Sequence, residues 1–182
     1  MGLFDFFKKK PDREYDPLNI RVVHLRENFM LDYDMKTWMV AEMYEYDWGE
    51  NYFTYEYKLD SGDDTIFLSV DEDDELEITV ARKIKLSSIE EDIELSVKQT
   101  GKPPKKLTYK GKAYFRDTEN AGFYRNVKDS FDDAIEFMSW DYYDEAEELN
   151  LCIEQWGKNE FEASFGKLAE EFQFTNIIPA NI

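Results

Sequence analysis

Residues 55–80 read YEYKLDSGDDTIFLSVDEDDELEITV: an aromatic strand, an acidic turn, an aliphatic strand, a second acidic turn and a third strand. Apolar residues alternate with polar ones along each strand, as in a half-buried antiparallel sheet. Residues 138–165 repeat this order. The step from Tyr57 to Ile66 equals the step from Trp140 to Leu149, nine residues in each copy. The matching order and spacing predict two related meanders.

The repeat predicts a mainly β fold. We expect two related antiparallel β-meander modules, barrel-like or sandwich, with one connecting helix. The 182 residues would divide into four segments. These are an N-terminal amphipathic arm and linker at 1–16, a first β module at 17–86, a connecting helix and Pro-containing linker at 87–104, and a second β module at 105–182.

A long central strand is expected at residues 35–48, because apolar side chains alternate on both of its faces. One face would carry the side chains of Trp38, Val40, Tyr44 and Tyr46. Such a strand needs cover on both sides, so it predicts the centre of the first module.

One helix is expected at residues 88–100, with Gly101 as its end. Two capping boxes fit its start, Ser87 with Glu90 and Ser88 with Glu91. A mobile loop is expected at 117–133, and a short strand that packs on the body at 172–182.

The net charge of −19 is the strongest global property of the chain. An acidic surface repels nucleic acids and attracts basic proteins and polycations. We therefore expect a protein partner and no nucleic acid, and the sequence leaves the oligomeric state open. The alternative is that the carboxylates keep a sheet-rich protein soluble. An aromatic content of 16% is enough to build a folded core despite 35% charged residues.

The first ten residues, MGLFDFFKKK, combine aromatic residues with a run of lysines. Such a segment can contact a membrane surface or a partner protein, and the alternative is that its aromatic side chains dock on the protein's own sheet. In a secretory signal the charges precede the apolar residues, whereas here they follow them. We therefore expect a cytoplasmic protein that contacts the inner face of the membrane peripherally. The residues expected to make this contact are Leu3, Phe4, Phe6, Phe7, Lys8, Lys9 and Lys10.

No catalytic constellation stands out in the sequence. A pair of the single histidine, His24, with the single cysteine, Cys152, is arithmetically possible, but nothing nearby would orient the imidazole. His24 is better interpreted as a strand residue with an ordinary hydrogen-bond partner. The acidic turns lack the ligand spacing of a calcium loop. We therefore expect no catalytic residue, no metal site and no cofactor.

Aromatic and acidic residues alternate in the first copy and suggest a site for small cations. Rings beside carboxylates hold ammonium groups through cation–π contact and charge pairing. The candidate cation-binding residues are Trp48, Tyr57 and Glu56. The alternative is that the rings face the core and the acids face water.

Several segments resemble the bacterial domain-of-unknown-function family 4178. They are YDMKTWMV at 33–40, the aromatic strand at 52–59, the strand pair at 66–70 and 76–80, and LTYKGK at 107–112. The similarity covers most of the chain from Leu18 onward. It implies a cytoplasmic accessory module, because members of this family are encoded beside phage-shock-type membrane-stress proteins and polyamine-synthesis enzymes. It implies no catalytic residues.

The leading functional hypothesis is therefore a non-enzymatic interaction module, linked to a membrane-stress system of the phage-shock type. The alternative is a protein that binds a polyamine or another small cation. An enzyme of unknown class is the third hypothesis, which a deep pocket that gathers His24 with two or more carboxylates would favour.

Overall fold

The structure is a computed structural model that describes residues 15–179. Its regular elements are eleven strands, one α-helix and four short 3-10 turns. The first strands are β1 Phe29–Tyr33, β2 Lys36–Gly49, β3 Tyr52–Asp60, β4 Thr65–Glu72 and β5 Leu76–Ile84. The helix α1, Ile93–Thr100, lies between β5 and β6. The later strands are β6 Lys106–Tyr109, β7 Lys112–Asn126, β8 Ile135–Tyr143, β9 Leu149–Trp156, β10 Glu160–Leu168 and β11 Thr175–Pro179.

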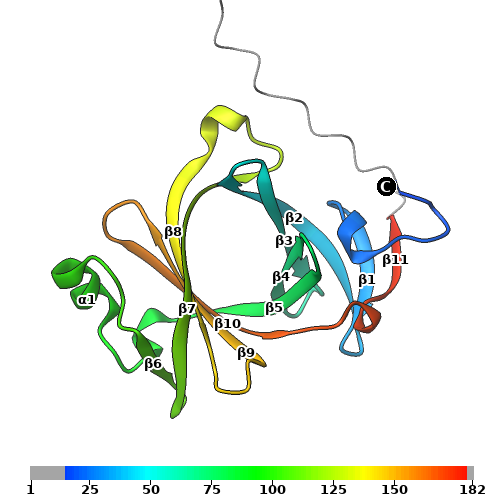
Figure 1. The fold of residues 1–182 in the computed structure, drawn as a ribbon. Coiled ribbons are helices and arrows are strands. Elements are labelled where there is room, and N and C mark those ends of the chain that lie inside the picture. Colours follow the sequence, from blue (N-terminus) through cyan, green and yellow to red (C-terminus); the bar gives the residue numbers. More distant parts are fainter. Residues whose placement is uncertain (1–14, 180–182) are drawn as a thin grey trace, which may run out of the picture.

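All strands form one antiparallel sheet that closes on itself (Figure 1). The order is β11-β1-β2-β3-β4-β5-β10-β9-β8-β7-β6, and an additional pairing of β2 with β7 joins eight of the strands, β2 to β5 and β7 to β10, into a ring. A largely buried ion pair between Glu45 and Arg125, 3.1 Å apart, lies at the β2–β7 junction. Closure leaves these eight strands with an inner and an outer face.

The two halves of the ring are built alike. Strands β1 to β5 have 5, 14, 9, 8 and 9 residues, and strands β6 to β10 have 4, 15, 9, 8 and 9. Each half opens with the same two-residue hairpin, 33–36 in one and 109–112 in the other, whose central residues all have positive φ angles. Residues 55–80 and 138–165 both form three-stranded antiparallel meanders. The structure is thus mainly β, as predicted, and compatible with two related modules.

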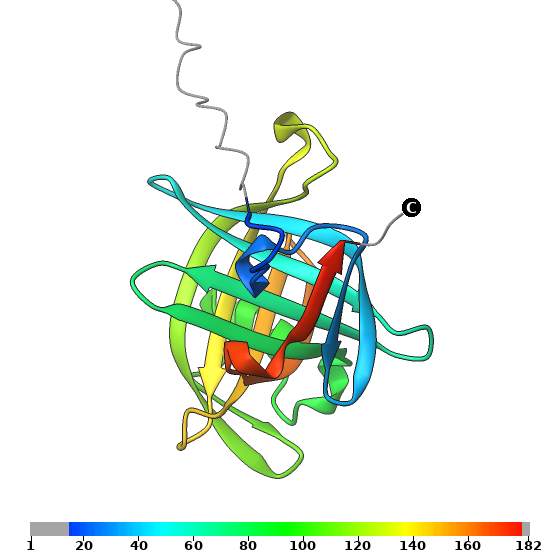
Figure 2. The same ribbon diagram turned by 90° about the vertical axis from the view of Figure 1, so that its right-hand side faces the viewer.

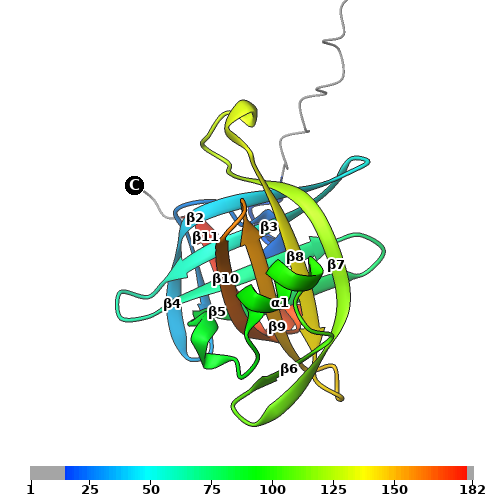
Figure 3. The same cartoon turned by 90° about the vertical axis from the view of Figure 1, so that its left-hand side faces the viewer.

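Two apolar cores lie on the outer face of the ring. The first packs residues of β2 to β5 against β1 and the segment around β11, which lie in front of these strands in Figure 2. The second packs residues of β7 to β10 against α1 and β6, and Figure 3 shows α1 across β8, β9 and β10. Alternation therefore turns the aliphatic side chains of these strands mostly outward, and the interior of the ring receives polar side chains together with several aromatic ones.

The prediction that one face of β2 carries Trp38, Val40, Tyr44 and Tyr46 is wrong, because one extra residue exchanges the two faces within the strand. Val40 pairs with Leu59 and Glu42 with Lys58, so Ala41 is an extra residue in the strand. Such a bulge reverses which side chains point to which face. Trp38 and Val40 therefore lie in the outer core, whereas Tyr44 and Tyr46 line a cavity at the ring's interior.

The predicted helix begins later than expected. Residues 86–88 form a 3-10 turn, and Asp92 caps α1 by accepting a hydrogen bond from the Leu95 amide at 2.9 Å. The capping boxes expected at Ser87 and Ser88 are therefore wrong, because Ile89 pairs with Tyr109 as an isolated bridge and keeps the chain extended there. The predicted end is confirmed, since Gly101 adopts a left-handed conformation with a φ of 80°.

Two further expectations need correction. The loop predicted at 117–133 is wrong over 117–126, where β7 continues to Asn126 and pairs with β8 and then with β2, whereas 127–133 lie between strands as expected. His24 lies in the 3-10 turn 22–24 and not in a strand; its Nδ1 accepts a hydrogen bond from the Arg21 amide at 3.0 Å. The short strand near the C-terminus is confirmed as β11.

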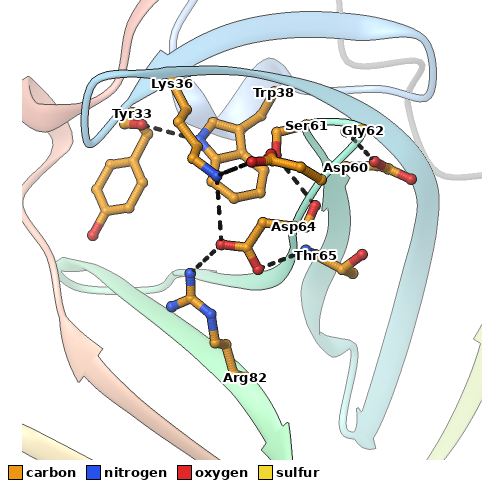
Figure 4. A network of polar contacts seen from close by, with 10 residues as sticks. Tyr33, Lys36, Trp38, Asp60, Ser61, Gly62, Asp64, Thr65 and Arg82 are labelled. Carbon is orange, nitrogen blue, oxygen red and sulfur yellow. Dashed lines mark hydrogen bonds and ion pairs between the residues drawn. The ribbon is translucent and has the colours of Figure 1, made fainter.

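Polar contacts tie the β3–β4 turn to its neighbours on the outer side of the sheet (Figure 4). The Lys36 ammonium lies 2.9 Å from Asp63, and Asp64 lies 2.6 Å from the Arg82 guanidinium of β5. These groups are exposed to solvent, so each pair contributes little to the stability of the fold.

Candidate functional site

The interior of the ring is a polar cavity of about 500 Å³. Of the described residues that line it, five carry carboxyl groups and one, Lys83, carries an ammonium group. Hydroxyl and amide side chains fill much of the remaining lining. The carboxyl groups are those of Glu56, Asp71, Glu77, Asp141 and Glu154.

The cavity opens at both ends of the ring. At one end a mouth of about 1010 Å³ shares the side chains of Tyr46, Glu56 and Lys83 with the interior. At the other end a mouth of about 670 Å³ shares Glu77 and Tyr143 with it. Lys83 and Glu77 are six residues apart on β5, so about 20 Å of strand separates the two ends.

The charged groups at the first mouth form a linked set. The Lys83 ammonium lies 3.3 Å from Glu154 of β9 and 2.7 Å from Glu162 of β10. Glu56 of β3 accepts hydrogen bonds from Ser69 at 3.3 Å and from Tyr46 at 3.4 Å. Deeper in the ring, Asp141 accepts a hydrogen bond from Thr118 at 3.0 Å.

Burial changes the acidity of this set. Burial, together with the neighbouring Glu154 carboxylate, raises the pKa of Glu56 to about 7. Burial also raises the pKa of Glu154, against the effect of Lys83. Burial lowers the pKa of Lys83, but Glu154, Glu56 and Glu162 outweigh it and the net pKa of Lys83 is raised. The lysine is therefore charged, and Glu56 exchanges a proton near neutral pH.

Aromatic rings line the same mouth. Tyr46 stacks on Trp48 with ring centroids 5.7 Å apart, and the rings of Tyr124 and Trp156 are 5.0 Å apart. The Lys83 ammonium lies 5.4 Å from the centre of the Phe67 ring. An ammonium group in this mouth thus meets carboxylates and ring faces together.

Two buried polar atoms of the cavity lining have no partner among residues 15–179, namely Asp71 Oδ1 and the Ser139 hydroxyl. The Ser139 hydroxyl lines the interior, its residue is 4% exposed, and among residues 15–179 nothing accepts from it or donates to it. Ser139 pairs with Glu154 across β8 and β9, so the two side chains are neighbours. A buried hydroxyl without a partner costs free energy, which a bound molecule can recover.

The structure brings together two of the three predicted cation-binding residues. Trp48 and Glu56 both line the cavity. Tyr57 does not, because it is 0% exposed in the outer core, on the opposite face of β3 from Glu56. The membrane or partner contact predicted for residues 3–10 lies outside the described residues.

His24 and Cys152 lie in different parts of the molecule. The His24 ring is 6.2 Å from that of Tyr15, near the N-terminal end of the described chain. Cys152 lines the ring's interior, where burial raises the pKa of its thiol well above the ordinary value. The Cys–His pair weighed from the sequence is therefore not formed.

Sequence reasoning missed the residues that dominate the site: Lys83, Asp141, Ser139 and Glu154. Glu154 and Cys152 alternate with apolar residues along β9, and such a pattern usually indicates a solvent-facing side. The sequence therefore carried no signal for these residues, because only the closed ring distinguishes a cavity from solvent.

Two kinds of feature are absent from the described part of the chain. Residues 15–179 contain no helix that is long and apolar enough to span a membrane. Within the same residues, no group of three or more His, Cys, Asp or Glu side chains is placed to share a metal ion.

Comparison with known proteins places the chain among sequences without an assigned activity. A family model described as a domain of unknown function, DUF4178, matches residues 27–171. An uncharacterized protein of Aquifex aeolicus (strain VF5) is 27% identical over 175 residues, which are 96% of this chain and 94% of that protein. No solved structure matches significantly.

Proposed function

Because the chain belongs to the DUF4178 family, whose description assigns no function, we propose a function from the site itself: the protein binds a linear polyamine inside the ring of strands. The single observation that carries this proposal is the excess of five carboxyl groups over one ammonium group in the cavity. A cationic ligand offsets that excess, and an anionic one adds to the repulsion.

The distribution of the carboxyl groups favours a ligand with several charges. Glu56 and Glu154 lie near one mouth, and Glu77 lies near the other, with Asp141 between them. One compact cation reaches one of these positions, whereas a linear chain of ammonium groups reaches several. The aromatic rings beside Glu56 can pack on the methylene segments and attract the ammonium groups.

The expected event is binding without covalent chemistry. Ammonium groups donate hydrogen bonds to the carboxylates and to Ser139, and ordered water leaves the cavity. Because Glu56 has a pKa of about 7, a cation at this position also favours release of its proton. Uptake of the ligand is therefore accompanied by proton release near neutral pH.

Titration calorimetry with spermidine tests the proposal. We expect saturable binding at about 0.15 M ionic strength, where contacts between exposed charges are largely screened. Glu154→Gln removes a carboxylate from the cavity and should weaken binding roughly ten-fold or more. Glu94→Gln, on the exposed face of α1, changes the net charge equally and should leave the affinity nearly unchanged. Heats that vanish on addition of salt would reduce the effect to counter-ion exchange.

A further inference from the structure

Lys83 already places an ammonium group in the proposed polyamine site. Its Nζ bridges Glu154 and Glu162 and lies over the ring of Phe67. Carboxylates from two strands and a ring face from a third therefore surround this cation. The Glu56 carboxylate on β3 also raises the pKa of Lys83 through its charge. The contacts of Lys83 thus show that this position accommodates an ammonium group.

The contacts of Lys83 differ in strength and exposure. The Glu162 side chain is 51% exposed and the Glu154 side chain 12%, and the Lys83 side chain, at 37%, lies between them at the mouth. The flexible four-carbon stem of a lysine can turn toward solvent. Lys83 can therefore keep its shorter contact to Glu162 while it gives up the longer contact to Glu154.

A second hydrogen-bond acceptor for an ammonium group, the Ser139 hydroxyl, lies next to Glu154 in the interior of the ring. The Ser139 hydroxyl lies across the strand pair from Glu154 and has no partner among the described residues, whereas Glu154 has the Lys83 ammonium 3.3 Å away. An ammonium group seated between Glu154 and Ser139 would satisfy both of these buried groups. Lys83, which enters from the mouth, satisfies one of them.

We infer that Lys83 is a resident ammonium group that the terminal ammonium of the ligand displaces from Glu154. This inference rests on the proposed polyamine binding and adds its mode of control. Without a ligand, Lys83 pairs with Glu154, so this buried carboxylate has a cationic partner. The Lys83–Glu154 contact also makes the site selective for ligands with several ammonium groups. Such a ligand must replace this contact and also form others deeper in the ring.

Calorimetry on two variants of adjacent residues tests the displacement. Lys83→Met keeps the apolar stem and removes the charge, so spermidine should bind roughly ten-fold more tightly or better. Arg82→Met removes the same charge from the next residue, whose side chain pairs with Asp64 on the outer side of the sheet, and should change the affinity less than about two-fold.

The other outcomes separate the two hypotheses. If the wild-type protein binds spermidine and Lys83→Met binds it equally or more weakly, displacement is wrong and polyamine binding stands. Equal gains in both variants would indicate a long-range field effect and would also overturn displacement. If no form of the protein binds spermidine, the proposed function fails, and this inference fails with it.

A second measurement detects the displacement in the wild-type protein, so its result does not depend on whether Lys83→Met folds. Protein labelled with ¹³C at the lysine ε-carbon is observed by NMR at neutral pH, where the amines of spermidine are charged, in the presence and absence of saturating spermidine. The Lys83 signal is assigned by its absence from Lys83→Arg. Displacement predicts that spermidine moves the Lys83 signal toward that of the exposed lysines, because the ammonium has left Glu154. An unchanged Lys83 signal would contradict it.

Discussion

At the scale of single residues, the ring's interior is defined by Glu56. Its backbone belongs to an ordinary strand, but its side chain lies on the inner face, where burial raises its pKa to about 7. The folded state therefore binds the Glu56 proton more tightly than the unfolded state does. By linkage, the contribution of Glu56 to the free energy of unfolding falls as the pH rises from the ordinary glutamate pKa to about 7.

This linkage predicts the effect of Glu56→Gln. At a pH near 8 the variant should be more stable than the wild type by about 2 kcal/mol, and near pH 5 the two should be nearly equal. Urea unfolding at the two pH values measures the difference. Glu94→Gln, which is exposed, serves as the control and should follow the wild type at both. A difference between Glu56→Gln and wild type that does not depend on pH would show that Glu56 titrates normally.

The sequence predicted the outward-facing residues well and the inward-facing ones poorly. Leu151 and Ile153 are apolar and form a core wherever the strand lies, whereas Cys152 and Glu154 are polar residues whose surroundings depend on closure of the sheet. Closure requires β2 to pair with β7 and β5 with β10, contacts between residues far apart in the chain. Ala41 adds a bulge that periodicity alone does not reveal.

At the scale of elements, the duplicated hairpins were available in the sequence. Tyr33-Asp34-Met35-Lys36 and Tyr109-Lys110-Gly111-Lys112 have the same two-residue turn, and in each the central pair has φ angles from 50° to 74°. Both turns precede the long strand of their half of the ring. An alignment that starts at these turns would extend the predicted repeat to five strands in each half.

The start of α1 provides a test at this scale. Asp92→Ala removes the side chain that accepts from the Leu95 amide, so we expect a loss of about 1 kcal/mol in the free energy of unfolding. Ser88→Ala removes an exposed hydroxyl that donates to the Lys85 carbonyl in the preceding turn, and should cost less than about 0.5 kcal/mol. Thermal unfolding of both variants measures the contrast. A larger loss of stability for Ser88→Ala than for Asp92→Ala would indicate that the helix begins at Ser88, as expected from the sequence.

At the scale of the whole molecule, the ring combines an interior lined by many polar groups with two apolar outer cores. This arrangement explains how a chain of net charge −19 folds, because the outward faces of the strands supply the apolar burial and the interior carries part of the charge. The interior carboxyl groups are retained at a cost in stability, and sites with such a cost are where function is expected.

The predicted contact of residues 3–10 with a membrane or partner is independent of the ring. Deletion of residues 2–10 should reduce co-sedimentation of the protein with vesicles that contain anionic phosphatidylglycerol, because the segment contributes aromatic side chains and three lysines. Spermidine affinity should stay unchanged in the same truncated protein. Equal co-sedimentation before and after the deletion would remove the anchor role and leave the cavity proposal intact.

The most direct test of polyamine binding is the crystal structure of the protein with spermidine. The account predicts a single spermidine inside the ring, with a terminal ammonium about 3 Å from a carboxylate oxygen of Glu154 or Glu56. It also predicts that the Lys83 ammonium has moved away from Glu154. Spermidine bound to the exposed acidic turn at 73–75, with the interior of the ring unchanged, would contradict binding inside the ring.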